Sequence, residues 1–381
     1  MALLLVLCAV VRSRGSAATG AAAIATGAAR PNAWQHSQKQ EDTLAAGRAL
    51  LNERVLANAA LPLMWSDEFD GASLKTSVWG MEIGDGSGVG LPGWGNNEQQ
   101  CYTASPSNVA IVPDPSDPSN GLLQITVRQN PGWSCDNGAA PASVRNYTSA
   151  RLHTRNSLGV RYSDNGTPVR VEARIKFPIA DGLWPAFWML PQQPNDYGLW
   201  CASGEIDILE HVNAATTVNA TLHYGGIPGG GGFDAPDCVN KGSVTDLGPA
   251  VAGWHTYGVE WAPAYIAFSI DGAEWYRAES SEWYSGSAPD SETAPFDRPF
   301  HLILNLAAGG GLPERDQPGV QIAPGDHSLF VDWVRVYGVA PIVPAGGLAL
   351  SPVPSPLSPA PRPSPLATRS PLPLLPTLMP A

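Results

Sequence analysis

The sequence predicts an all-β sandwich over residues 61–340. In this span, short apolar runs are separated by Gly, Pro, Asn and Asp, and several runs alternate apolar with polar residues, as half-buried strands do. The dipeptide Asp271-Gly272 lies between two such runs, which is a strong signal for a two-residue hairpin turn. A span of about 280 residues can bury about three quarters of its surface around one core, so no second domain is needed.

The predicted strands follow one another along this span. Residues 63–69 open it, and residues 169–175 read Val-Arg-Val-Glu-Ala-Arg-Ile, in which every second side chain is apolar. Because successive side chains of a strand point to opposite faces, such a run buries one face and exposes the other. By the same reasoning we predict four further strands, at residues 122–127, 257–261, 265–270 and 329–337.

The two ends of the chain differ in composition from the predicted sandwich. Residues 1–18 combine an apolar run with small residues and predict a secretory signal peptide, although no Lys or Arg precedes the run. Residues 19–60 are Ala-rich and predict a leader, with one helix or as a loosely ordered extension. Residues 341–381 repeat Ser-Pro and Pro-Leu, so we predict an extended, disordered tail. The apolar runs are too short for a transmembrane segment.

Charge excludes one class of partner. The chain has 22 Lys and Arg against 34 Asp and Glu, a net charge of −12. Proteins that bind nucleic acid need a basic surface for the phosphates, so we expect no nucleic-acid partner. The 13 Trp residues offer flat faces on which sugar rings can stack, although many indoles of a β protein belong to its core.

Cysteine usage indicates an oxidising compartment. Besides Cys8 in the predicted signal peptide, the chain holds four cysteines without CxxC spacing, which predicts two disulfides rather than a zinc site. Three pairings among them are open, and one hypothesis is that Cys201 is joined to Cys238. Three glycosylation sequons begin at Asn146, Asn165 and Asn219. Together with the signal peptide, these features predict a secreted or cell-wall-associated protein.

The most informative stretch is residues 204–210, Gly-Glu-Ile-Asp-Ile-Leu-Glu. In a strand, Glu205 and Asp207 share one face and the isoleucines share the other. Glu210 is out of phase with this alternation, but one extra residue in a β-bulge would return it to the face of the other two acids. The stretch therefore predicts a row of three carboxylates on one side of a bulged strand.

Such a row has a chemical use. With one residue absorbed by the bulge, the Cα atoms of Glu205 and Glu210 would lie about 13 Å apart. Long side chains leaning inward would bring their carboxyls to the separation of about 5–5.5 Å that retaining glycosidases use. Mutual repulsion must raise at least one pKa, which keeps one acid protonated while another is ionised. A solvated acidic face or a calcium site would use the same residue types.

The sequence resembles glycoside hydrolase family 16, in its laminarinase-like branch. The resemblance begins with residues 183–191, Leu-Trp-Pro-Ala-Phe-Trp-Met-Leu-Pro, followed by Tyr-Gly-Leu-Trp at 197–200 and the acids at 204–210. Two residues between Asp207 and Glu210 are typical of that branch. Further ordered matches cover nearly all of the predicted sandwich, at residues 65–69, 94–98, 149–152, 221–226, 260–261 and 331–337.

This resemblance implies a fold, an activity and a site. The fold would be a jelly-roll sandwich of two curved antiparallel sheets, similar to concanavalin A, with a concave substrate cleft. Glu205 would be the nucleophile and Glu210 the general acid and base, assisted by Asp207, in retaining, endo-acting cleavage of β-1,3-glucan. The resemblance also implies six substrate-binding residues: Asn97, Arg151, Trp184, Trp188, Trp200 and His223. For the three Trp residues, Arg151 and His223, a purely structural role is the alternative.

The resemblance implies no required cofactor and no metal at the site. It leaves open a structural calcium near Glu68 and Asp332, for which ordinary salt-bridged surface acids are the alternative. The expected partner is β-glucan, and we expect a monomer. Other functions stay open, namely a non-hydrolytic β-glucan-binding protein, a hydrolase of mixed-linkage glucan, agar or carrageenan, and a transglycosylase. The presence of all three acids favours an enzyme.

Overall fold

The computed structural model describes residues 61–193, 196–226 and 237–339. The predicted signal peptide (1–18), leader (19–60) and Pro-rich tail (341–381) lie outside these residues. In the described part of the chain, no helix is both long and apolar enough to cross a membrane.

The described residues form two β-sheets. One sheet has ten strands: β15 (Ala273–Glu279), β14 (Tyr265–Ile270), β13 (His255–Ala262), β8 (Val169–Lys176), β17 (His327–Tyr337), β5 (Asp117–Cys135), β6 (Ser143–Ser149) and β3 (Gln100–Tyr102), with β1 (Leu63–Asp67) on β17 and β4 (Val109–Asp114) on β5. The other has seven: β12 (Cys238–Asp246), β11 (Thr217–Gly225), β10 (Glu205–Glu210), β9 (Leu183–Pro191), β16 (Phe300–Ala308), β7 (Arg151–His153) and β2 (Gly80–Glu82).

Helices are short in these ranges. They comprise one α-helical turn and four 3-10 turns: α2 (Gly311–Asp316), η1 (Ser87–Val89), η2 (Pro92–Gly95), η3 (Gly248–Ala252) and η4 (Ser280–Glu282).

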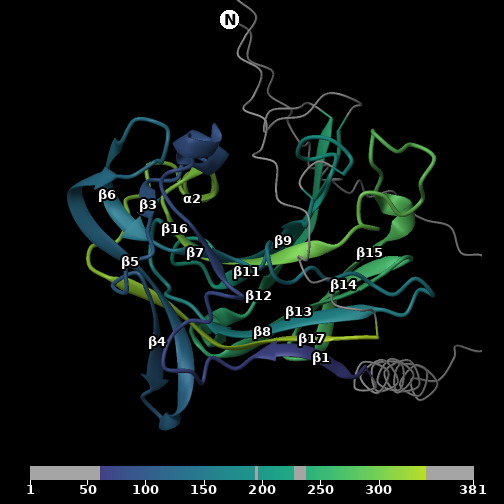
Figure 1. The fold of residues 1–381 in the computed structure, drawn as a ribbon, viewed down its shortest axis with the longest axis horizontal. Helices are drawn as coiled ribbons and strands as arrows, with labels where there is room; N and C mark the ends of the chain where they lie inside the picture. The colour runs from purple at the N-terminus through teal and green to yellow at the C-terminus, as the bar shows by residue number, and fades with distance from the viewer. Residues whose placement is uncertain (1–60, 194–195, 227–236, 340–381) are drawn as a thin grey trace, which may run out of the picture. The chain divides into compact units, whose positions relative to one another are not determined.

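The core lies between the two sheets, which are stacked face to face (Figure 1). Phe187 and Leu304 from the seven-stranded sheet join Val171 and Trp261 from the ten-stranded sheet in one cluster of fully buried apolar side chains. Burial of this apolar surface is the main stabilising contribution to such a sandwich. The other face of the seven-stranded sheet, which points away from this core, carries polar and aromatic residues.

The alternation read from the sequence matches the observed strands. Strand β8 buries Val169, Val171 and every second residue after them, and β14 has the predicted bounds. The turn between β14 and β15 has two residues in the left-handed region, Asp271 with φ 52° and Gly272 with φ 78°. Positive φ at both positions is the requirement of the type I′ hairpin, so this predicted turn is confirmed.

Two features differ from the sequence-based expectation. Strands β3 and β6 pair in parallel, so the sandwich is not wholly antiparallel. Strand β16 was not predicted, because its run of Phe, Leu, Ile and Ala is buried on both faces and shows no alternation.

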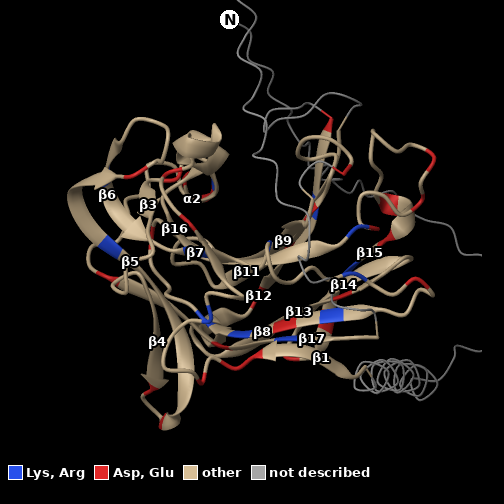
Figure 2. Ribbon diagram, in the orientation of Figure 1, with Lys and Arg blue, Asp and Glu red and all other residues tan. Residues whose placement is uncertain are grey.

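Charged residues of both signs lie interspersed on the ten-stranded sheet, around β8, β13 and β17 (Figure 2). Arg170 and Glu172 of β8 form an ion pair at 3.2 Å, and Arg174 reaches Asp332 of β17 at 2.5 Å. The surface of this sheet is therefore locally neutralised.

Two disulfides join the four cysteines, Cys101 to Cys135 and Cys201 to Cys238. The second confirms the hypothesis that the segment before the acidic strand is tied to Cys238. It links the residue after Trp200 to the start of β12, the edge strand of the seven-stranded sheet.

We predict that the Cys201→Ser/Cys238→Ser variant is less stable than the wild type by about 2–4 kcal/mol, because the cross-link closes a loop of 37 residues in the unfolded chain. Urea unfolding under non-reducing conditions measures the difference. An unchanged free energy of unfolding would contradict the prediction, and the Cys101→Ser/Cys135→Ser variant, with a separation of 34 residues, is the matched comparison.

Candidate active site

The three acids lie on β10, and the strand carries the predicted bulge. On the β11 side, Asp207 pairs with Thr221 and Glu210 with Asn219, so three steps along β10 match two along β11. On the β9 side, the register shifts between Asp207 and Leu209. One extra residue is therefore accommodated between Asp207 and Glu210, which confirms the bulge.

The bulge separates apolar from acidic side chains. Ile206, Ile208 and Leu209 are all buried in the core cluster. Glu205 and Glu210 are half-buried, and Asp207 is 3% exposed. Neither glutamate is turned into the sandwich interior. The acids thus occupy the side of the seven-stranded sheet that faces away from the core, which we call the acid face.

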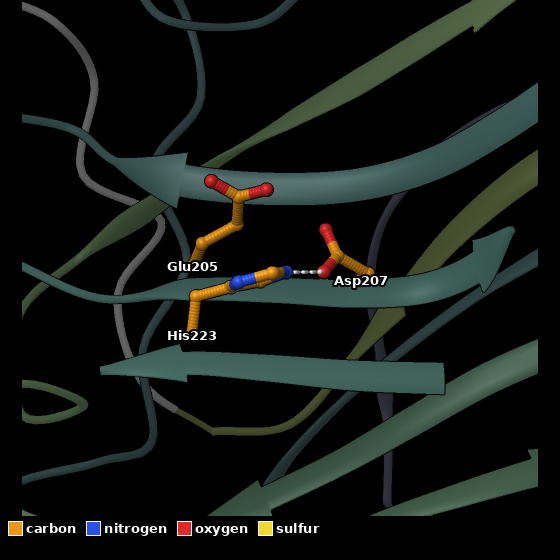
Figure 3. Close-up of side chains that lie close together, drawn as sticks. All are labelled: Glu205, Asp207 and His223. Carbon is orange, nitrogen blue, oxygen red and sulfur yellow. Dashed lines mark ion pairs between the residues drawn. The ribbon is translucent and has the colours of Figure 1, made fainter. Parts of the chain in front are cut away.

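His223 of β11 completes this cluster. It is the register partner of Glu205, and its Nε2 forms an ion pair with Oδ2 of Asp207 at 2.9 Å. Figure 3 shows Glu205 and Asp207 on one side of their strand, with the imidazole of His223 reaching from the neighbouring strand to Asp207. Nδ1 of His223 lies 2.7 Å from Oδ1 of Asn240 on β12.

Burial and mutual repulsion change the acidity of these carboxyls. Burial raises the pKa of Glu210, and the charge of Glu205 raises it further, against the opposing effect of His223. The same two causes raise the pKa of Asp207. A carboxyl with a raised pKa can keep its proton at neutral pH, which is the requirement for a general acid.

The pKa of His223 shifts upward, although burial alone would lower it. Desolvation disfavours the imidazolium, but the nearby carboxylates of Asp207, Glu205 and Glu210 outweigh it and raise the pKa of His223 to about 10. At neutral pH the site therefore holds a positive charge among three acids. This charge offsets part of their repulsion.

Two indoles hold the two glutamates. Nε1 of Trp184 donates to Oε1 of Glu210 at 3.0 Å, and Nε1 of Trp200 donates to Oε2 of Glu205 at 2.6 Å. Each bond restricts the orientation of its carboxylate. Trp184 and Trp188 are four residues apart on β9 and so lie on the same side of it, and Trp188 pairs with Asp207 across the strands.

Arg151 lies between two aromatic rings on the same face. Its guanidinium carbon is 4.9 Å from the ring centre of Trp94 and 4.6 Å from that of Trp188. Such stacking stabilises a cation and fixes the plane of the guanidinium. Asn97, in contrast, is exposed in the turn before Glu98, with φ 58°, and the structure does not bring it into the acid cluster.

Sequence reasoning missed a buried polar group beside Arg151. Glu98 accepts hydrogen bonds from Gln100 at 2.6 Å and Tyr102 at 3.1 Å, and burial raises its pKa. Asn305 of β16 accepts from Trp188 Nε1 at 2.7 Å and donates to Tyr102 at 3.2 Å. A lone Asn within an apolar run signals a buried polar contact, but that strand was not predicted.

One group of side chains in the described residues is close enough to hold a metal ion. Glu205, Asp207 and His223 each offer one ligand atom within 4.8 Å of the others. A protonated imidazole has no free lone pair, so a metal ion would have to displace the proton that the surrounding carboxylates favour on His223. We therefore interpret the group as an acid–base cluster, and the prediction that no cofactor is required stays a prediction.

Glu68 and Asp332, considered for a structural calcium, are each paired with an arginine. Arg335 binds both carboxylate oxygens of Glu68, at 3.1 and 2.8 Å. Arg174 and Asn120 contact the two oxygens of Asp332. These contacts fit the alternative of salt-bridged acids, and calcium binding stays a prediction.

Comparison with known proteins identifies the family. The model of Glycosyl hydrolases family 16 matches residues 119–333, more than half of the chain. The chain belongs to glycosyl hydrolases family 16. A β-glucanase of Rhodothermus marinus is 35% identical over 282 residues, which cover 72% of this chain and 84% of that protein.

Further relatives agree with this assignment. Glucan endo-1,3-beta-glucosidase A1 of Niallia circulans is 36% identical over 74% of this chain, which spans only 38% of the length of that relative. The catalytic domain of an endo-1,3-beta-glucanase (laminarinase) from Thermotoga petrophila RKU-1 superimposes with a TM-score of 0.58 at 30% identity, covering 73% of this chain and 97% of that one. The predicted laminarinase-like resemblance, jelly-roll fold and glycoside hydrolase class are thereby confirmed.

We predict that Trp184→Phe raises the pKa of Glu210 above its wild-type value. An N–H donor stabilises the ionised carboxylate, so its removal favours the protonated form. Carboxyl ¹³C NMR titration measures the shift. Trp188→Phe is the matched control, because the indole of Trp188 donates to Asn305 instead. An equal shift in both variants, or none in either, would contradict the prediction.

Proposed function

We propose that the protein is an endo-acting β-1,3-glucanase that cleaves laminarin-like polymers with retention of configuration. One observation carries this proposal: the bulge of β10 brings Glu205 and Glu210 to the same face as Asp207, with each glutamate held by an indole N–H. The relatives named endo-1,3-beta-glucosidase and laminarinase support the substrate.

The proposed reaction has two steps. In the first, the carboxylate of Glu205 attacks the anomeric carbon, the glycosidic C–O bond breaks, and Glu210 gives its proton to the leaving oxygen. In the second, Glu210 takes a proton from water, the hydroxyl attacks the anomeric carbon, and the bond to Glu205 breaks. Two inversions give net retention, and both carboxyls return to their starting states.

The raised pKa of Glu210 supports its role as the acid, because this residue must be protonated when substrate binds. The indole donor on Glu205 supports the role of nucleophile, because it stabilises a carboxylate and aims it. Asp207 lies between them in the sequence and is buried. It would affect the ionisation of Glu205 through its charge and would exchange a proton with His223.

An uncharged polysaccharide suits the rest of the acid face. Trp184, Trp188 and Trp200 are half-buried, so part of each ring is open to a sugar while the rest is packed. The stacked Arg151 would donate to sugar hydroxyls, and the exposed Asn97 would contact a more distant unit of the chain. His223 would sit beside the cleaved bond. The concave cleft expected for this fold would run over these residues.

We also propose that the protein acts outside the cytosol, secreted or bound to a cell wall, and as a monomer. Two disulfides in the described residues support an oxidising compartment, because thiols stay reduced in most cytosols.

We predict that Glu205→Gln and Glu210→Gln each lower kcat on laminarin by about 10³-fold or more, since each removes one group of the acid–nucleophile pair. Reducing-end release measures kcat, and calorimetry with laminarin oligosaccharides checks that binding persists. Glu260→Gln on β13 of the other sheet is the matched control and keeps an acceptor for Tyr265. Full turnover in either active-site variant would contradict the assigned roles.

A substrate panel separates the proposed activity from its alternatives. Laminarin, lichenan, agarose and carrageenan are incubated with the wild type, and products are sized by chromatography. Internal cleavage of laminarin supports the proposal. Cleavage of agarose or carrageenan alone, products longer than the substrate, or tight laminarin binding without cleavage would each contradict it, as evidence for another hydrolase, a transglycosylase or a binding protein.

For the stereochemistry, we predict that the first product released from laminarin carries a β-anomeric reducing end. Two displacements at one carbon preserve its configuration. Proton NMR in the first minutes of the reaction, before mutarotation, distinguishes the anomers. An α product would indicate a single displacement by water and would exclude Glu205 as nucleophile.

A further inference from the structure

The imidazole of His223 has polar partners on two strands. Toward β10, Nε2 forms the 2.9 Å ion pair with Asp207. Toward β12, Nδ1 lies 2.7 Å from the amide oxygen of Asn240, the register partner of His223. Its ring also packs against Trp200, with ring centres 5.5 Å apart.

The contact with Asp207 does not fix the ring by itself. Nε2 lies 2.9 Å from Oδ2 of Asp207, and both the charge of Asp207 and a hydrogen bond to it favour the protonated ring. One contact leaves the ring free to tilt about that nitrogen, so its orientation depends also on the second nitrogen.

Asn240 supplies an acceptor for that nitrogen. An amide oxygen has no proton to give, so Nδ1 must carry the hydrogen in this contact. With Nε2 facing the carboxyl of Asp207 as well, an ionised Asp207 presents acceptors to both ring nitrogens, an arrangement that suits the doubly protonated imidazolium.

We propose that Asn240 is a positioning residue, which holds His223 as an oriented imidazolium against Asp207 and so governs how protons are shared among the three acids. Asn240 is exposed and acts through His223, and it need not touch the reacting atoms. This inference rests on the proposed function of the acid cluster and identifies a residue outside it that regulates its charge.

The charged groups that face His223 explain why this matters. Asp207, Glu205 and Glu210 all come from β10, and they favour the protonated ring against the cost of burial. From β12 comes the neutral Asn240, and from the loop before β10 comes the indole of Trp200. If the ring tilts or loses its proton, the acids lose a positive neighbour and hold their own protons more tightly.

The test combines an NMR titration with kinetics on the full chain. We expect Asn240→Ala to lower the pKa of His223 by about one unit, the size of one hydrogen bond to a charged group. Asn240→Asp retains an acceptor oxygen, so the pKa of His223 should stay at or above the wild-type value. Histidine ring signals, assigned by comparison with His223→Gln, report the titration.

The kinetic readout is the pH dependence of kcat/KM on laminarin. His223 stays protonated over this range, but without Asn240 its charge is held less firmly beside the acids, so the pKa of Glu210 should rise and the basic limb, which reports the general acid, should move upward in Asn240→Ala and return in Asn240→Asp. Ser243→Ala, on the opposite face of β12, is the control and should change neither readout. A simple loss of packing would not move the limb.

The outcomes separate this inference from the proposed function. A wild-type His223 that is neutral at pH 7, or a His223 titration unchanged in Asn240→Ala, would overturn the role of Asn240 even in an active glucanase. Because the titration needs no turnover, the expected shift in a protein that cleaves no β-glucan would overturn the proposed function and leave the role of Asn240 standing.

Discussion

The site depends on one extra residue in β10. Without it, Glu210 would point into the sandwich and Leu209 would lie on the acid face, because strand side chains alternate. The bulge satisfies two demands together, since Ile208 and Leu209 both reach the core while the acids before and after them share the other face. Core packing and the geometry of the acid face therefore depend on the same backbone irregularity.

Three carboxylates on one strand need partners, and the neighbouring elements provide them. Strand β9 and the segment before β10 each contribute an indole donor, and β11 contributes the imidazole of His223. Each of these groups presents an N–H hydrogen to a carboxylate oxygen, which lowers the free-energy cost of placing three negative charges close together. Beside them, Arg151 adds a cation held between Trp94 and Trp188. The acid face is thus a balance of charges as much as a geometric arrangement.

Most of the fold and the centre of the site could be read from the sequence, because alternation and the out-of-phase Glu210 are local patterns. The Asp271-Gly272 turn is predictable for the same reason. What could not be read depends on contacts between distant segments. Three features produce no periodic pattern in the sequence: the parallel pairing of β3 with β6, the burial of β16 on both faces, and the Asn305–Tyr102–Glu98 contacts. Asn240 belongs with them, since only strand register places it beside His223.

The register of β11 also bears on how the protein can be produced. Asn219 and Thr221, the first and last residues of one sequon, stand opposite Glu210 and Asp207 and are half-buried on the acid face. An oligosaccharide attached to Asn219 is bulky and would cover the carboxyls beside it. Protein from an expression host that glycosylates this sequon would then have the same sequence as protein from a host that does not, but its three carboxyls would be less accessible to a polysaccharide.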